Sequence, residues 1–145
     1  MLTISSPAEP GSVDELAQAM HPDDADELAA AGVSVADALA GQSLSALRWS
    51  GRLVALFGCV QQPAGAGVPW MLCTSALQDV PRQAMAAISA HVVANWMGVH
   101  TVLQNMVHRR NARALRFVRW LGFQVHPEPV GPGGEFFLFS WRRDV

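Results

Sequence analysis

The sequence predicts an α/β fold: a single domain with a mixed central sheet of six to seven strands and helices on both faces. The first observation is length, because 145 residues are the usual size of one domain with its own core. The second is a change in hydrophobic period from helical to strand-like near residue 44. The third is the order of elements beyond that point, a three-stranded meander followed by alternating helices and strands.

Residues 1–43 are predicted to form an acidic, helical N-terminal part of this domain. Ser12-Val-Asp-Glu15 has the pattern of a capping box that opens a short helix. His21-Pro-Asp-Asp24 ends that helix and begins a second one, whose first turn is rich in acidic residues. Ser34 begins a third short helix, so the sequence predicts that the first third of the chain is all-helical.

Residues 44–145 are predicted to form the sheet core with two main helices. Three segments are rich in strand-forming residues and predict an antiparallel meander: residues 44–49, 53–61 and 70–74. The proline and glycines of residues 63–67 predict the turn between the second and third of these strands.

The first main helix is predicted over residues 81–97, where apolar residues recur at helical spacing. Asp79 is its expected N-cap, Pro81 fits the first turn, and Gly98 ends it. A strand is expected over residues 101–107.

The second main helix is expected to begin after Asn111 and to end at Gly122. A turn rich in glycine then precedes a last strand over residues 135–141. The sequence contains no internal repeat and no sign of a second domain.

The composition excludes several classes of protein. No apolar run approaches the roughly 18 residues that a membrane span needs, so we expect no membrane partner. The N-terminus has neither a basic flank nor an apolar core, and secretion by a signal of its own is not expected. Cys59 and Cys73 do not make a disulfide framework, which favours a reducing compartment. The chain has neither lysine nor tyrosine.

The charges are segregated along the chain. Residues 1–47 contain eight acidic residues and no basic one, whereas residues 108–143 contain seven arginines and two glutamates. Such asymmetry marks either a face for nucleic acid or a partner, or a solvated helix side next to an acidic neighbour in the same fold. We favour the second alternative, because the net charge is −2 and nucleic-acid-binding domains usually have a pI above about 9. Nucleic acid is therefore a disfavoured partner.

One motif lies on the second main helix, where residues 111–123 read N-A-R-A-L-R-F-V-R-W-L-G-F. Asparagine can cap the helix, alanine permits close packing, and glycine supplies a left-handed C-cap. With the element order, this motif resembles the signature N-x-x-A-x-x-x-Y-x-x-x-G-F of the GNAT acetyltransferase superfamily. Asn111, Ala114, Gly122 and Phe123 fall at the matching places. The resemblance implies a GNAT-like domain over the whole chain, with acetyl-CoA as its acyl donor.

A narrower resemblance runs from about Trp70 to the C-terminus. The segments W-M-L-C-T-S-A-L, L-Q-N-M-V-H-R-R-N and W-L-G-F, with a G-x-x-F-x-x-F-like ending, resemble GNAT-related proteins of tailed bacteriophages. Those include the small internal virion proteins of short-tailed phages. This resemblance implies a location in the host cytoplasm or the phage virion, and a virion or host protein as partner.

Two segments compete for the pyrophosphate loop that the resemblance implies, which has the pattern Gln/Arg-x-x-Gly-x-Gly/Ala. Gln62 to Gly67 matches its letters as Q-P-A-G-A-G, but a strand follows instead of the helix N-terminus that binds phosphate. We therefore interpret it as a hairpin turn. Residues 78–84, Q-D-V-P-R-Q-A, stand at the matching distance before the signature. They are degenerate, because Pro81 removes an N–H donor and Asp79 adds a carboxylate.

The resemblance implies a set of candidate cofactor-binding residues: Gln78, Arg82, Gln83, Ala84 and Asn111. Among them, the Arg82 guanidinium can partly replace the missing donor as a phosphate ligand. A capped helix start without a ligand is the alternative, and it fits each of these residues.

His108 is the candidate catalytic base, because it ends a predicted strand and histidine has a suitable pKa. A surface histidine beside two arginines is the alternative. Val118 stands where the resemblance places the tyrosine that protonates the departing thiolate. No metal site is expected, since the five histidines share no ligand spacing.

Two functions follow. The first is an acyl-CoA-dependent N-acetyltransferase with a degenerate pyrophosphate loop. The alternative is a non-catalytic phage virion or structural protein that retains the GNAT fold, which the altered loop and Val118 favour. A third and weaker hypothesis, nucleic-acid binding, rests on five arginines spaced along one helix: Arg109, Arg110, Arg113, Arg116 and Arg119. The sequence indicates neither an acceptor substrate nor an oligomeric state.

Overall fold

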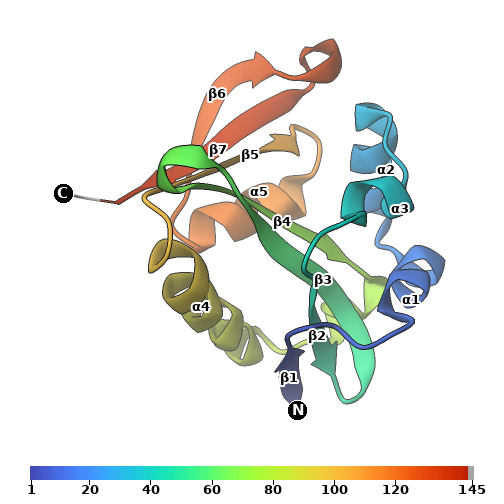
Figure 1. Ribbon diagram of the computed structural model, residues 1–145. Coiled ribbons are helices and arrows are strands. Elements are labelled where there is room, and N and C mark those ends of the chain that lie inside the picture. Colours follow the sequence, from blue (N-terminus) through green and yellow to red (C-terminus); the bar gives the residue numbers. More distant parts are fainter. Residues whose placement is uncertain (144–145) are drawn as a thin grey trace. The chain divides into compact units, whose positions relative to one another are not determined.

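The predicted α/β class is confirmed in a computed structural model, which describes residues 1–143. The described chain contains five α-helices and a seven-stranded mixed sheet with the order β1-β2-β3-β4-β5-β7-β6 (Figure 1). Two compact units share the chain: residues 1–58 with 70–87 form the first unit, and residues 59–69 with 88 onward form the second. Strands β3 (Arg52–Gln61) and β4 (Ala66–Cys73) contribute residues to both units.

The strands of the first unit form an antiparallel arrangement. Strand β2 (Ser45–Trp49) pairs with β3, with a bulge after Leu47. Strand β1 (Leu2–Ser5) pairs with the other side of β2. The prediction of an all-helical first third was therefore wrong at its beginning. Four residues are too few to show a strand period, and their pairing with β2 decides their conformation.

Three helices lie between β1 and β2, as predicted: α1 (Ser12–Ala19), α2 (Pro22–Ala31) and α3 (Val35–Leu39). The Ser34 hydroxyl caps α3 by accepting from the N–H of Asp37 at 3.1 Å, also as predicted. The grouping of residues 1–43 as a separate part of the domain stays a prediction.

The predicted capping box at the start of α1 is wrong. The N-cap is Gly11, with φ +88°, and the Ser12 hydroxyl instead donates to the carbonyl of Glu9 at 2.7 Å. The Glu15 carboxylate is used elsewhere in the unit: its Oε1 accepts from Nη2 of Arg48 at 3.0 Å, and its Oε2 accepts from the N–H of Leu53 at 3.2 Å. A side chain that ties α1 to β2 and β3 in this way cannot also close the first turn.

The Arg48 cluster comprises the Arg48 guanidinium and two carboxylates. Nε of Arg48 lies 3.4 Å from Oε2 of Glu9, and Nη2 of Arg48 lies 3.0 Å from Oε1 of Glu15. The hydrogen bond from Arg48 holds the pKa of Glu15 below its usual value. The pKa of Glu9 is lowered as well, first by the Ser5 hydroxyl and then by Arg48. Part of the acidic N-terminal charge is thus neutralised within the first unit.

The apolar core of the first unit joins these helices to the strands. Leu16 of α1 and Leu56 of β3 are fully buried in it. The remaining buried members are Leu39, Ala46, Leu53 and Leu72.

The second unit contains the longest ladder of the sheet, between β5 (Val102–His108) and β7 (Phe136–Arg142), which are antiparallel. Strand β6 (Gln124–Val130) pairs with the other side of β7 and contains a bulge between Val125 and Pro129. Figure 1 shows β5, β7 and β6 in orange to red. Buried aromatic rings join these strands, with Phe123 edge-on to Phe139 at a centroid distance of 5.1 Å.

The first main helix is irregular. It begins at Arg82 as a 3-10 turn (Arg82–Met85, η3), continues as α4 (Ala86–Val92) and ends in a π-helical turn (Val93–Met97, η4). Its N-cap is Pro81, and not Asp79 as predicted. No helix among residues 1–143 is long and apolar enough to cross a membrane.

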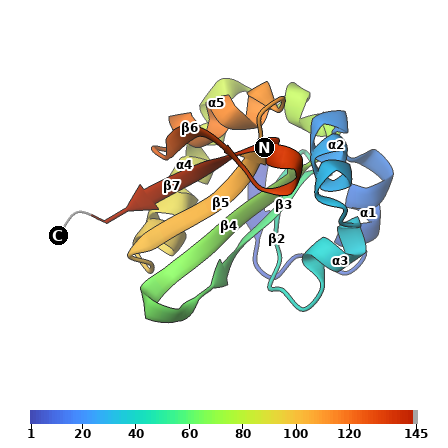
Figure 2. The same cartoon turned by 90° about the horizontal axis from the view of Figure 1, so that it is seen from above.

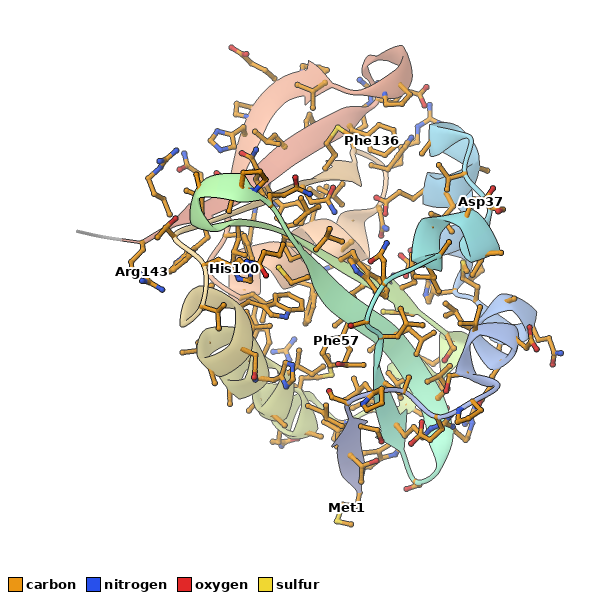
Figure 3. The ribbon with its side chains drawn as sticks, in the orientation of Figure 1. Met1, Asp37, Phe57, His100, Phe136 and Arg143 are labelled. Atoms are coloured by element: carbon orange, nitrogen blue, oxygen red, sulfur yellow. The ribbon has the colours of Figure 1, made fainter. Side chains whose placement is uncertain are left out.

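The end of the first main helix and His100, three residues beyond it, hold the chain just after β7. The His100 side chain is buried, and Nη2 of Arg143 donates to the His100 carbonyl at 3.1 Å. The Arg143 guanidinium also donates to the carbonyl of Met97 at 2.9 Å. Figure 3 shows Arg143 and His100 close together.

The Q-P-A-G-A-G segment is a hairpin turn, which confirms its interpretation from sequence. Residues Pro63–Gly65 form a 3-10 turn (η1), closed by a bond from the N–H of Gln62 to the carbonyl of Ala66 at 2.8 Å. Gly65 has φ +76°, which favours glycine. Gly67 lies in β4, where a Cβ would meet Sγ of Cys59 at 2.7 Å and a ring carbon of His100 at 2.8 Å. Turn geometry and close packing account for both glycines.

We expect Arg48→Met to lower the free energy of unfolding by about 1–3 kcal/mol at pH 7, because it removes charge-assisted hydrogen bonds to Glu15. The folded-state pKa of Glu15 is lowered, so its contribution is complete above the usual glutamate pKa of about 4.3 and is lost as the pH falls. Urea unfolding should therefore show a difference from wild type at pH 7 that shrinks toward about pH 3.

Arg52→Met is the matched control. The ion pair of Arg52 with Asp79 is mostly exposed, at 67% and 52% of the two side chains, and its loss should change stability by less than about 1 kcal/mol. Equal losses in the two variants, or a pH-independent loss in Arg48→Met, would contradict the account of the Arg48 cluster.

Candidate functional site

The first feature of the candidate site is an early end to the parallel ladder between β4 and β5. In the second unit the ladder consists of the pairs Ala66↔Val102 and Gly67↔Leu103, and Figure 2 shows the two strands side by side. The carbonyl of Pro69 accepts from the Asn105 side-chain amide at 2.8 Å, so it faces β5. The next step of the ladder would need an N–H that proline lacks. Within the second unit the ladder therefore ends at Gly67, and the Asn105 side-chain amide takes the Pro69 carbonyl.

The end of β4 lies in the first unit, where the junction of α1 and α2 holds it. The N–H of Cys73 donates to Oδ2 of Asp24 at 2.8 Å, and the carbonyl of Cys73 accepts from the N–H of His21, also at 2.8 Å. Asp24 is only 3% exposed, so this bond is shielded from water. The N–H of Thr74 donates to the carbonyl of Val54 in β3 at 2.8 Å. Cys73 and Thr74 thus use opposite edges of β4, as alternation along a strand requires.

Met71 lies two residues before Cys73, so its N–H and C=O face the same edge of the strand, away from β3. Among the described residues of the first unit, no group forms a hydrogen bond with either. An unpaired backbone group in the middle of a strand is a place where an extended ligand can add its own amides. We call the backbone of Met71 the open position of β4.

A loop leads from this strand to the start of the first main helix. The Thr74 hydroxyl donates to the carbonyl of Leu53 at 2.6 Å and accepts from the N–H of Ala76 at 3.2 Å, which fixes the exit from β4. A 3-10 turn, Ser75–Asp79 (η2), follows, and the helix then begins at Arg82. The first unit therefore contains the order strand, loop and helix N-terminus that a phosphate site requires.

The predicted cofactor residues Gln78, Arg82, Gln83 and Ala84 lie together on this loop and the first helical turn. The first three are exposed and Ala84 is half-buried. The first helical hydrogen bond runs from the N–H of Ala84 to the carbonyl of Pro81 at 3.0 Å. The N–H groups of Arg82 and Gln83 precede it and have no acceptor within the helix.

Asp79 does not point a free carboxylate at these N–H groups. Its Oδ2 accepts from Nη1 of Arg52 in β3 at 3.0 Å. The ion pair offsets the charge that the sequence places in the loop, although the missing N–H of Pro81 is not replaced.

The other two predicted site residues lie in the second unit. Asn111 is 3% exposed and caps α5 (Ala112–Trp120) by accepting from the N–H of Ala114 at 3.2 Å. Its observed role is structural, and contact with a cofactor stays a prediction. Val118 lies on the same helix and has no proton to donate.

His108 is held by hydrogen bonds on both ring nitrogens. The N–H of Arg110 donates to Nδ1 at 3.1 Å, and Nε2 lies 3.2 Å from Oε2 of Glu135. A neutral ring with an acceptor at Nδ1 carries its proton on Nε2, which donates to Glu135. The ring also packs edge-on against Phe136, with 5.2 Å between centroids. Both ring nitrogens of His108 therefore have a hydrogen-bond partner in this arrangement, and its catalytic role stays a prediction.

Burial raises the pKa of the Cys59 thiol to about 11, which favours the neutral thiol over the nucleophilic thiolate. Desolvation lowers the pKa of His91, which favours its neutral form. Among residues 1–143, no cluster of three histidine, cysteine or acidic side chains could hold a metal ion.

The open position of β4 and the residues that hold the end of that strand were missed by sequence reasoning. Backbone groups carry no signal in a sequence, so Met71 reads as an ordinary apolar strand residue. Asp24 was predicted only as one of the acidic residues in the first turn of the second helix, and its bond to β4 was not foreseen.

Comparison with known proteins gives a structural likeness without a sequence match. The sequence matches no protein-family model and no curated protein. The ribosomal-protein-S18-alanine N-acetyltransferase of Escherichia coli superimposes with a TM-score of 0.65 at 20% identity, over 100% of this chain and 96% of that one.

Two similar structures contain the ligand that the sequence resemblance implies. The paia N-acetyltransferase of Thermoplasma acidophilum, in complex with coenzyme A, has a TM-score of 0.65 at 11% identity over 99% of both chains. A GNAT family acetyltransferase of Elizabethkingia anophelis with acetyl-CoA bound has a TM-score of 0.61 at 12% identity over 98% of both. At these identities the likeness concerns the fold, and the described chain has the fold of the GNAT acetyltransferases.

Proposed function

We propose that this protein is an acyl-CoA-dependent N-acetyltransferase with acetyl-CoA as acyl donor. The observation that carries the proposal is the open position of β4, followed in the same unit by a helix N-terminus. The fold supports it, since coenzyme A or acetyl-CoA is bound in two of the similar structures. Acetyl-CoA has two parts that suit these features, an extended arm with two amides and a pyrophosphate.

The chemistry of the described donors fits this ligand. The N–H and C=O of Met71 have no partner within the first unit and could pair with the amides of an extended arm. The N–H groups of Arg82 and Gln83 and the positive end of the helix suit a pyrophosphate. The Arg82 guanidinium is exposed and can add a charge-assisted bond. Asp79 already pairs with Arg52, so its carboxylate repels the phosphates less than the sequence suggests.

Bound acetyl-CoA supplies an activated acyl group that an amine can attack. The chain itself contributes positioning more than proton transfer. Val118 cannot protonate a departing thiolate, and the lone pair of His108 already accepts from the Arg110 N–H. We therefore propose that bulk water or the acceptor itself handles the protons, which a good leaving group such as a thiolate allows.

A second candidate is a non-catalytic protein that retains the GNAT fold, acting in a phage virion or through a host protein. Val118 in place of a catalytic acid and the closed hydrogen bonds of His108 favour it. The likeness to phage proteins rests on the sequence motifs from Trp70 onward. On either candidate we propose a location in the host cytoplasm or the virion.

Calorimetric titration with acetyl-CoA and with free coenzyme A tests the proposal. We expect binding in the micromolar range, and Arg82→Ala should weaken it about tenfold, because one charged hydrogen bond to phosphate is removed. Arg142→Ala is the matched control, because it removes an exposed arginine from β7, outside the loop. If millimolar acetyl-CoA produces no heat of binding and no shift in melting temperature, the enzyme proposal fails and the non-catalytic candidate remains.

Met71→Pro tests the open position itself. Proline removes the Met71 N–H, which bonds no group of the first unit, so the fold should survive while acetyl-CoA binding weakens at least about tenfold. Circular dichroism and thermal melting check that the fold is retained, and Met71→Leu keeps the N–H as a control. Unchanged binding in a folded Met71→Pro variant would show that the arm does not pair there.

A further inference from the structure

The exposed face of α5 combines arginines with one aromatic ring. At 100° per residue, Arg116, Arg119 and Trp120 fall within one arc of the helix, and all three are exposed. Leu115 and Leu121 fall outside this arc and are buried. The sequence of α5 contains no acidic residue. We call Arg116, Arg119 and Trp120 the basic-aromatic face.

Trp120 is unusual on this face, because its side chain is 51% exposed in the middle of charged residues. Its ring stacks on Phe117, one turn earlier, with 5.9 Å between centroids and 27° between planes. Stacking holds the indole in place, so a flat apolar surface stays presented to solvent. Packing within the second unit does not require this exposure, and an exposed ordered ring of this kind is typical of a binding surface.

The arginines of this face have no carboxylate partner in the described part of the chain. Among residues 1–143, no acidic side chain forms an ion pair with Arg116 or Arg119. The same holds for Arg109 and Arg110, which are exposed just before α5. The described part of the second unit contains seven arginines and two glutamates, whereas the first contains nine acidic residues and three arginines. The overall pI is therefore an average over an acidic first unit and a strongly basic second unit.

We propose that the basic-aromatic face of α5 binds single-stranded RNA without sequence preference. Guanidinium groups next to an exposed indole match alternating phosphates and bases, since each base can stack on an aromatic ring while its phosphate meets an arginine. A purely acidic polypeptide such as polyglutamate would use the arginines but has no ring to stack on the indole. A duplex keeps its bases stacked on each other and cannot use Trp120. RNA is the nucleic acid that regularly presents unstacked bases in loops and ends. This proposal is independent of acetyl-CoA binding, and it revises the expectation drawn from the overall pI.

Fluorescence anisotropy with a labelled uridylate oligomer of about twelve nucleotides tests the proposal, over a series of salt concentrations. Wild type should bind with a dissociation constant of about 1–100 µM at low salt. Arg116→Ala with Arg119→Ala should reduce the slope of log affinity against log salt by about 1.4, because each phosphate that is no longer neutralised accounts for about 0.7. Trp120→Ala should weaken binding by roughly 5- to 100-fold with little change in that slope, and Trp120→Phe should keep most of the affinity.

Arg142→Ala is the matched charge control, because Arg142 is exposed on β7, outside α5. Thermal melting checks that each variant is folded. If Trp120→Ala does not fold, the salt slope of the double arginine variant still tests the proposal. Weak binding of a matched RNA duplex supports the proposal. Two results together would overturn it in favour of an acidic protein. Polyglutamate would compete for the protein as well as the unlabelled oligomer does, and Trp120→Ala would bind the oligomer with wild-type affinity. Binding of a thymidylate oligomer more than about tenfold tighter would overturn the assignment to RNA. Arg142→Ala losing as much affinity as the α5 variants would overturn the location.

Discussion

The backbone hydrogen bonds along one edge of β4 are the constraint on which the candidate site depends. Pro69 ends the ladder with β5 because it lacks an N–H, and Asn105 takes its carbonyl. At the other end, the buried Asp24 holds Cys73. A strand fixed at both places keeps Met71 extended without a backbone partner in its unit. Such a position is costly unless water or a ligand completes it, which is why we assign it to the acyl donor.

Much of the fold follows from local signals, whereas the site follows from contacts that such signals do not contain. Asn111 caps α5 as its sequence pattern predicts, because capping is decided within one turn. The turn at Q-P-A-G-A-G was predicted on the same grounds. Glu15 shows the limit, since a distant Arg48 takes the side chain that a local capping box would use. The backbone of Met71 belongs to the same class, because its hydrogen-bond partners are decided by other segments and not by its own sequence neighbourhood.

The site that emerges is stronger in backbone geometry than in side-chain chemistry. Arg82 and two helix N–H groups form the phosphate site that we propose, while Val118 has no proton to donate and His108 is hydrogen-bonded at both ring nitrogens. Such a balance fits an enzyme that relies on positioning and a good leaving group, or a fold kept for another purpose. The basic-aromatic face of α5 shows that charge in this chain is arranged by unit, so function has to be read from each surface and not from the net charge.

The central claim, which the proposed function makes, is that the Met71 backbone, which has no partner within its own unit, pairs with acetyl-CoA when the ligand binds. Amide hydrogen exchange at Met71, followed by nuclear magnetic resonance with and without saturating acetyl-CoA, tests it most directly. The account predicts fast exchange of this N–H in the free protein and strong protection on binding, while the Cys73 N–H, bonded to Asp24, is protected in both states. A Met71 N–H that is already protected in the free protein, or that exchanges equally fast at saturation, would contradict the account.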